Sequence, residues 1–317
     1  MSRLGANVPH KAARYIGAAA AALSCVSLLE IIPHTLCIER YKKFLAKYKR
    51  GEEVPVHENT KKLFSEVLDD LKVKPKYKEL YEPFIITGFD TYNAGIATNR
   101  CKVIIGIPSY FIYKNKSLVD VMDIRIGSNR ALLNPYDPTT ENLVESLVLS
   151  EKAKKYGIAR EVLMSQWNLP LYRVLESPTI ITCSIIISDV MQKRYQIFQK
   201  PLIVAVFAYF GLGLMSFATW FQIRDALNNY FEKSVDEQLA KLGRDYVEGG
   251  KEFYEKLLKR NVAVRKLLGP HGKKRYNQLG DEIRFIRHKK TPLTERKKFF
   301  EDYKVPETLI QGERLTA

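Results

Sequence analysis

The longest uninterrupted apolar stretch of the chain lies at residues 201–223 and contains no charged side chain. As a helix it would span roughly 34 Å, which is enough to cross a hydrocarbon core of about 30 Å. Trp220 lies near one end of the stretch, where membrane interfaces favour amphipathic rings. A buried core helix of this length and composition would be unusual, so the pattern predicts a transmembrane helix over residues 201–223.

A shorter apolar segment at residues 174–191 precedes it and carries Asp189 close to its end. Residues 192–200 form a basic linker between the two segments. This order predicts a transmembrane hairpin, which leaves the regions before and after it on the same side of the membrane. Two interpretations of Asp189 stay open, because it fits either a functional intramembrane carboxylate or a hydrated side chain at the interface.

A third and weaker apolar segment lies at residues 15–33, which are rich in alanine and include Glu30. Residues 1–14 before it are basic and contain no acid. The combination is similar to a mitochondrial targeting segment, although a secretory signal has a similar apolar core. The segment is therefore either a weak transmembrane helix or a targeting element. The basic residues around the predicted spans do not fix the orientation of the hairpin.

The first soluble region, residues 38–173, combines helical and strand patterns. Residues 60–73 place leucines and a valine at helical spacing, and a proline ends the run. Residues 82–89 and 101–113 are rich in β-branched and aromatic side chains, which predicts two strands, with residues 93–95 in a turn between them. This region is expected to be a mixed α+β structure.

The second soluble region, residues 224–317, is basic and mainly helical in pattern. One helical stripe stops at the glycine pair 249–250, and residues 282–288 resemble a short strand. The chain as a whole is predicted to be an α+β membrane protein. In this fold class a transmembrane helical hairpin is inserted between two soluble segments that form one domain.

The helix predicted over residues 154–167 raises the question of catalysis. Core-type residues recur along one face, and Arg160, Glu161 and Met164 stand where a zinc peptidase of the HExxH type carries histidine, glutamate and histidine. Such an enzyme needs two imidazoles to hold the metal and a carboxylate to act as general base on the bound water. A guanidinium cannot ligate a cation, so an active zinc protease is not expected.

The order of the surrounding segments is nevertheless similar to that of membrane-embedded zincin peptidases. After the predicted hairpin, Glu232 and Asp236 lie four residues apart on a helix, as the third ligand and its neighbour do in those peptidases. Two hypotheses stay open: a degenerate zincin-like scaffold with vestigial positions at 160, 161, 164, 232 and 236, or an unrelated α+β domain. No catalytic residue, metal or cofactor is expected on either hypothesis.

Charge is distributed unevenly along the chain, whose formal net charge is +16. Residues 259–298 contain fourteen Lys or Arg but only three acids, Asp281, Glu282 and Glu295. Such an excess fits either an anionic partner, such as lipid head groups, or a solvated basic face. The stretch has few aromatic side chains to stack on bases, so nucleic acid is not an expected partner. The four cysteines form no CxxC pair, and free thiols are expected.

Three stretches of the chain resemble a known family. They are "VIIGIPSYF", "SLVLSEKAKKYGIAREV" and "GGKEFYEKLLKRNVAVRKLLGPHGKKRY", of which the last is the most specific. Together they are similar to the transmembrane protein 177 family of mitochondria, over about residues 60–290 and including the hairpin. The resemblance implies a multi-pass protein of the mitochondrial inner membrane that assists biogenesis of cytochrome c oxidase.

In that family the implied role is to associate with newly made oxidase subunit 2 and to stabilise its assembly chaperone. The resemblance implies no catalytic residues, and it implies a soluble bulk that faces the matrix. The function expected from the sequence is therefore a non-enzymatic assembly factor. A divergent membrane peptidase-like protein and a membrane-tethered RNA-binding protein are the alternatives.

Overall fold

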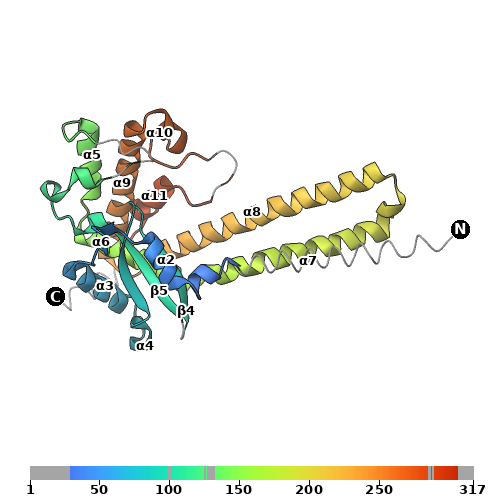
Figure 1. Ribbon diagram of the computed structural model, residues 1–317, viewed down its shortest axis with the longest axis horizontal. Helices are drawn as coiled ribbons and strands as arrows, with labels where there is room; N and C mark the ends of the chain where they lie inside the picture. Colours follow the sequence, from blue (N-terminus) through green and yellow to red (C-terminus); the bar gives the residue numbers. More distant parts are fainter. Residues whose placement is uncertain are drawn as a thin grey trace.

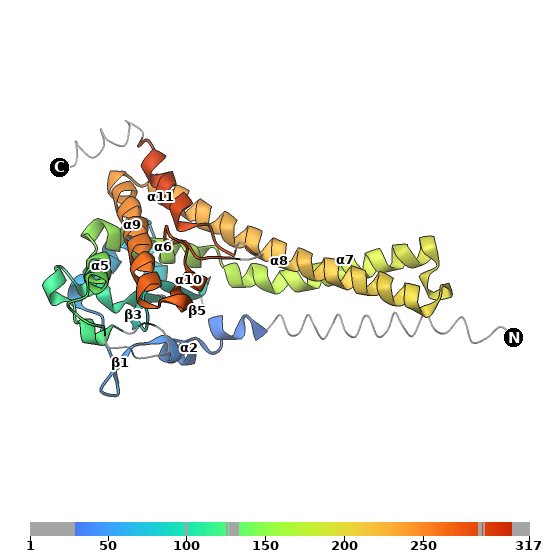
Figure 2. The same ribbon diagram turned by 90° about the horizontal axis from the view of Figure 1, so that it is seen from above.

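The computed structural model describes residues 29–98, 101–124, 126, 133–284, 287 and 289–305 of the 317-residue chain. Two long helices, α7 (Leu169–Tyr195) and α8 (Leu202–Ala240), project side by side from a body of shorter helices and strands (Figures 1 and 2). The mixed α and β composition expected for the soluble part is confirmed. Most of the predicted N-terminal segments, 1–14 and 15–33, lie outside the described residues.

A three-stranded sheet forms part of the body. Its strands are β3 (Tyr81–Ile86), β4 (Tyr92–Thr98) and β5 (Cys101–Pro108), with β5 in the centre, parallel to β3 and antiparallel to β4. The predicted turn at residues 93–95 is wrong, because these residues lie within β4. Gly95 has a φ of +109°, and a Cβ at this position would collide with the backbone of Lys102, so glycine permits a bulge there.

Helices of the body surround this sheet, and their ends follow local capping chemistry. The Asp137 side chain accepts a hydrogen bond from Thr139 N–H at 2.8 Å and caps α5, and the hydroxyl of Ser150 caps α6 in the same way. The remaining elements are η1 (Ile32–His34), α2 (Ile38–Leu45), β1 (Tyr48–Lys49), β2 (Glu52–Glu53), α3 (Glu58–Asp70), α4 (Pro75–Lys78), η2 (Ser109–Ile112), η3 (Lys116–Leu118), η4 (Val121–Asp123), α5 (Pro138–Leu147), α6 (Glu151–Gln166), η5 (Ile197–Gln199), α9 (Arg244–Leu267), α10 (Pro270–Arg275) and α11 (Leu293–Asp302).

Helix α6 lies at the centre of the body, where it contacts α9, β4, α8 and α3. Its apolar residues are buried as the sequence predicts, but Lys154, Glu161 and Ser165 are buried as well. The expectation of a single core face is therefore too narrow. The reason is that α6 is covered on one side by the sheet and on another by helices from beyond the hairpin.

Helix α9 passes without interruption through the glycine pair at which the sequence predicts a stop. A Cβ on Gly249 would collide with the carbonyl group of Lys152 at the start of α6, and one on Gly250 would approach the ring of Phe300 to 2.9 Å. The pair therefore allows α9 to approach α6 and α11 closely instead of ending the helix. The two soluble segments pack into a single body through these contacts.

The hairpin consists of the two helices that contain the predicted spans 174–191 and 201–223. Both helices are long and apolar enough to cross a membrane, and almost none of their apolar length is buried within the chain. Ser184 and Ser216 join them by a hydrogen bond of 2.7 Å. Helix α8 does not end with the apolar run but continues to Ala240, and its last turns belong to the core of the body.

Residues 282–288 do not form the predicted strand in the part that the structure describes. Glu282 makes only an isolated bridge to Tyr276, and residues 283, 284 and 287 are irregular. Residues 285, 286 and 288 lie outside the described residues.

Candidate functional site

The residues singled out on α6 and α8 meet at the base of the hairpin. Arg160 Nη1 lies 2.6 Å from a carboxylate oxygen of Glu161, and its Nη2 lies 3.6 Å from a carboxylate oxygen of Glu232. The two helices contact each other here because α8 enters the body beside α6. Residues separated by about seventy positions in the sequence are thus brought into one buried cluster.

Strand β4 and the residue before it supply further partners for Glu161, whose residue surface is only 3% exposed. Thr91 Oγ1 donates to one carboxylate oxygen at 2.7 Å, and Asn93 Nδ2 donates to the other at 2.5 Å. Arg160 contributes the third interaction. Both oxygens of Glu161 are therefore engaged, which offsets the cost of burying the carboxylate.

Asp236, one turn further along α8, is held by an arginine that the sequence does not single out. Arg296 of α11 donates from Nε and Nη2 to the two oxygens of Asp236, each at 2.6 Å. The hydroxyl groups of Tyr156 and Tyr254 also donate to Asp236, at 2.6 and 3.0 Å. Such a bidentate pair with both partners buried fixes the position of α11 against α8.

Glu232 is shared between the two arginines and the backbone. It accepts a hydrogen bond of 2.9 Å from Thr291 N–H, and Arg296 Nη1 lies 3.7 Å from the same oxygen. Three carboxylates and two guanidinium groups thus form one network, which we call the buried charge cluster: Arg160, Glu161, Glu232, Asp236 and Arg296.

The protonation states of the cluster follow from burial and charge. Burial acts to lower the pKa of Arg160, but the carboxylates of Glu161 and Glu232 outweigh it and hold that pKa above its ordinary value. The pKa of Arg296 is raised for the same reason, by Asp236. Burial, with Asp236 nearby, raises the pKa of Tyr156 and Tyr254. The arginines stay charged and the tyrosines stay neutral as donors.

Two residues that the sequence singles out are not members of the buried charge cluster. Met164 is partly buried and packs against the apolar core. Asp189, which the sequence leaves between two interpretations, is exposed near the turn of the hairpin and pairs with Lys193 at 2.6 Å. Asp189 and Lys193 therefore form an ion pair within α7.

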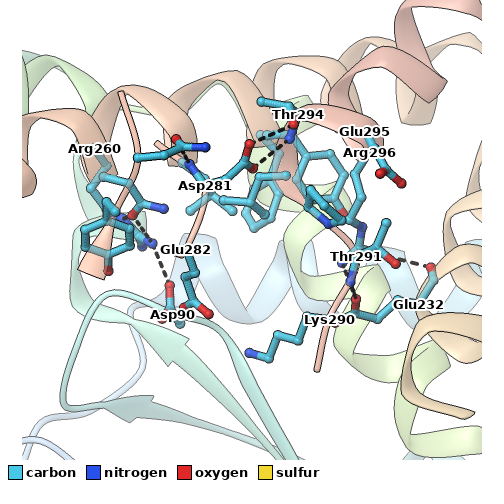
Figure 3. Close-up of a pocket in the computed structure, with 18 of the residues that line it drawn as sticks. Asp90, Glu232, Arg260, Asp281, Glu282, Lys290, Thr291, Thr294, Glu295 and Arg296 are labelled. Atoms are coloured by element: carbon cyan, nitrogen blue, oxygen red, sulfur yellow. Dashed lines mark hydrogen bonds and ion pairs between the residues drawn. The ribbon is translucent and has the colours of Figure 1, made fainter. Parts of the chain in front are cut away.

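A cavity of about 480 Å³ opens beside the buried charge cluster (Figure 3). Arg160, Glu232 and Arg296 line its floor, while Asp90 and Arg260 pair at 2.8 Å on another wall. Figure 3 also shows Asp281 bonded to Thr294, with both oxygens accepting from that residue. The wall is therefore polar, with most of its charges paired within the chain.

The donor set does not fit a metal ion. Among the residues that the structure describes, no three His, Cys, Asp or Glu side chains are placed to hold one. Arg160 occupies the space between Glu161 and Glu232 instead, and its guanidinium has no lone pair to offer. The arrangement places fixed cations beside the carboxylates.

Comparison with known proteins places these elements in a family. The family model described as Transmembrane protein 177 matches residues 87–308, which is most of the chain. The chain belongs to the transmembrane protein 177 family. The match extends from before β4 to beyond α11, so it includes the hairpin and every member of the buried charge cluster.

Relatives named Transmembrane protein 177 are similar over most of their length. The protein of Xenopus laevis is 26% identical over 280 residues, which cover 87% of this chain and 90% of the relative. That of Danio rerio is 28% identical, covering 79% and 80%, and that of Homo sapiens is 27% identical, covering 86% and 88%. No solved structure matches the chain. This member of the transmembrane protein 177 family is thus a membrane protein with two membrane-capable helices.

Proposed function

We propose that this chain is a non-enzymatic assembly factor of the mitochondrial inner membrane that supports biogenesis of cytochrome c oxidase. It associates with newly made subunit 2 and stabilises the assembly chaperone of that subunit. Membership of the transmembrane protein 177 family supports this proposal, since the family resemblance implies that role. The hairpin supplies a surface for partner helices within the bilayer, and the body supplies a surface for partners outside it.

The buried charge cluster is the observation that carries the non-enzymatic part of the proposal. Glu161 is the residue that would have to act as general base, but Thr91, Asn93 and Arg160 donate to its two oxygens and its residue surface is only 3% exposed. A general base needs a free lone pair within reach of the proton that it removes. The cluster instead stabilises the junction of α6, α8 and α11, which is the property expected of a rigid binding scaffold.

A direct test is affinity purification of the tagged full chain from mitochondria in which newly synthesised subunits are labelled. We expect subunit 2 and its chaperone to be recovered with it. A matched control is the Lys298→Met variant, which changes an exposed residue of α11 and should recover the same partners. Recovery of neither partner by the wild-type chain would reject the proposed role.

We also propose that the body is a degenerate zincin-like scaffold. Its support is the convergence of the α6 positions 160 and 161 with the α8 positions 232 and 236, together with the contact from β4. Metal analysis of the purified chain discriminates this proposal from the alternative of a membrane peptidase. We expect no stoichiometric zinc, whereas tightly bound zinc together with turnover abolished by Glu161→Gln would establish an enzyme.

The soluble body is proposed to face the matrix. Protease treatment of intact mitochondria, and of mitoplasts with a ruptured outer membrane, tests this orientation. We expect the body to be protected in both preparations. Cleavage of the body in mitoplasts would place it in the intermembrane space.

A further inference from the structure

Two positively charged side chains lie beside α8 at the point where its apolar run ends, and a third follows one of them closely in the sequence. Ile223 is the last residue of that run, and Arg224 is the first charged residue after it. Arg287 approaches the same level from the segment between α10 and α11, because its guanidinium carbon lies 3.7 Å from the ring centroid of Phe221. Lys289 follows two residues later and is exposed.

Carboxylates of the chain hold both arginines in place. Arg287 donates from Nε and Nη2 to Asp225, at 3.1 and 2.7 Å. Arg224 donates from Nε to Glu176 at 2.9 Å and from Nη2 to Glu30 at 2.8 and 2.9 Å. Each guanidinium is therefore oriented before any ligand binds, which lowers the entropic cost of binding.

Donor groups remain unused on all three side chains. Within the described part of the chain, Nη1 of Arg224 and Nη1 of Arg287 have no hydrogen-bond partner, and Lys289 forms no ion pair. The side chains of Arg224 and Arg287 keep 20% and 27% of their surface exposed. Arg224 and Arg287 lie at the level of the membrane–water interface if residues 201–223 cross the bilayer, and Lys289 is two residues from Arg287 in the chain.

We propose that Arg224, Arg287 and Lys289 form a binding site for the head group of an anionic phospholipid. Guanidinium groups with free N–H donors suit a phosphate, and a lysine near an anionic surface adds attraction to it. The aromatic rings of Trp220 and Phe221 lie beneath the two guanidinium groups and occupy the level at which acyl chains begin. The site thus combines anion recognition with an apolar border.

The test uses the full-length protein reconstituted in vesicles of phosphatidylcholine alone or of phosphatidylcholine mixed with phosphatidylglycerol. We expect the anionic lipid to raise the Tm of the wild-type chain by about 2 °C or more, an effect that high salt weakens. Lys289→Glu should lose most of this shift. The control variant Lys298→Glu, which reverses an exposed charge on α11, should keep it.

Three outcomes would overturn the assignment. These are the absence of a shift in the wild-type chain, a wild-type response of Lys289→Glu, and a loss in Lys298→Glu as large as that in Lys289→Glu. Inorganic phosphate added to phosphatidylcholine vesicles is a further arm, and a full shift in that arm would make the ligand a free anion instead of a lipid. The site does not depend on the proposed assembly role, so the two proposals can fail separately.

Discussion

Arg296 is the residue on which the buried charge cluster most depends, since it holds Asp236 by two hydrogen bonds and is itself 3% exposed. We expect Arg296→Met to lower the free energy of unfolding by about 3–5 kcal/mol, because its loss leaves buried carboxylates without a counter-charge. Denaturant unfolding of the purified protein in detergent measures this change. Lys298→Met, on the same helix, should stay within about 0.5 kcal/mol of the wild type.

A second substitution separates charge from packing at this site. Addition of Asp236→Asn to Arg296→Met should recover part of the lost stability, because it removes one of the stranded negative charges. If Arg296→Met proves as stable as Lys298→Met, the cluster does not close the junction of the helices in the way argued above.

His34 makes the stability of the fold depend on pH. Its Nδ1 accepts a hydrogen bond of 3.2 Å from Gly95 N–H, and burial, with Arg173 nearby, lowers its pKa from the ordinary 6.5. The folded state therefore favours the neutral ring, and below pH 6.5 the unfolded state binds the proton more readily. Stability from this group is present at neutral pH and falls as the pH drops below about 6.5.

We expect the Tm of the wild-type chain to fall more steeply between pH 7 and pH 5 than that of His34→Gln, whose side-chain oxygen can accept the same bond. Parallel slopes for the two proteins would mean that His34 does not contribute. His57→Gln is the matched control, because His57 is exposed.

Sequence reasoning singled out four residues of the buried charge cluster, but as vestigial zincin-like positions, and it did not single out the fifth. Arg160, Glu161, Glu232 and Asp236 follow from the spacing of two helices and the order of segments, which are local signals. Arg296 lies within the basic stretch 259–298, whose composition predicts a solvated face equally well. Which of its cations turns inward is decided by tertiary packing, so no local pattern could have distinguished it.

At the scale of elements, α9 shows how a glycine pair can be misread. Glycine is unfavourable within a helix, so the sequence predicts a stop, yet the pair lies in mid-helix because neighbouring elements leave no room for a side chain. The hairpin, in contrast, was predictable, since an apolar run of 23 residues without a charge is rarely found outside a membrane span. Local composition determines membrane spans, whereas close contacts between distant helices are visible only in the fold.

The close approach of Gly249 in α9 to Lys152 in α6 predicts the effect of adding a methyl group at position 249. Gly249→Ala should lower the free energy of unfolding by about 1–3 kcal/mol, because the new Cβ collides with the backbone of Lys152. Gly213→Ala in α8 is the control, since nothing lies within 4 Å of its added Cβ. Thermal unfolding of both variants in the same detergent compares them. Equal stability of the two would show that α6 and α9 can separate without cost.

The four-residue spacing of positions 160 and 164 on α6 also predicts the result of introducing a zinc site. Arg160→His combined with Met164→His places two imidazoles four residues apart on one helical face, near Glu232. We expect the double variant to bind one zinc ion per chain and to gain thermal stability from it. Arg160→His alone should bind zinc far less tightly. A double variant without zinc, yet folded, would argue against the zincin-like scaffold.

At the scale of the whole molecule, the two soluble regions fold as one unit because α6, from before the hairpin, packs against α9, from after it. Residues 224–317 expressed alone should therefore lack cooperative unfolding. Residues 1–196 and 197–317, produced together as separate chains in one membrane, should copurify. A cooperative transition in the isolated fragment 224–317 would instead establish two independent domains.

Helix α8 passes from the apolar run into the core without a break, so one continuous helix joins the membrane-capable segment to the body. Its last turns carry Glu232 and Asp236 inside the body. Its apolar run is not buried within the chain and can contact other helices in a bilayer. We expect a neighbour that tilts the apolar part of α8 to shift its last turns as well, because the helix has no break between them. Association inside the membrane would then change the contacts that α8 makes with α6 and α11 in the buried charge cluster.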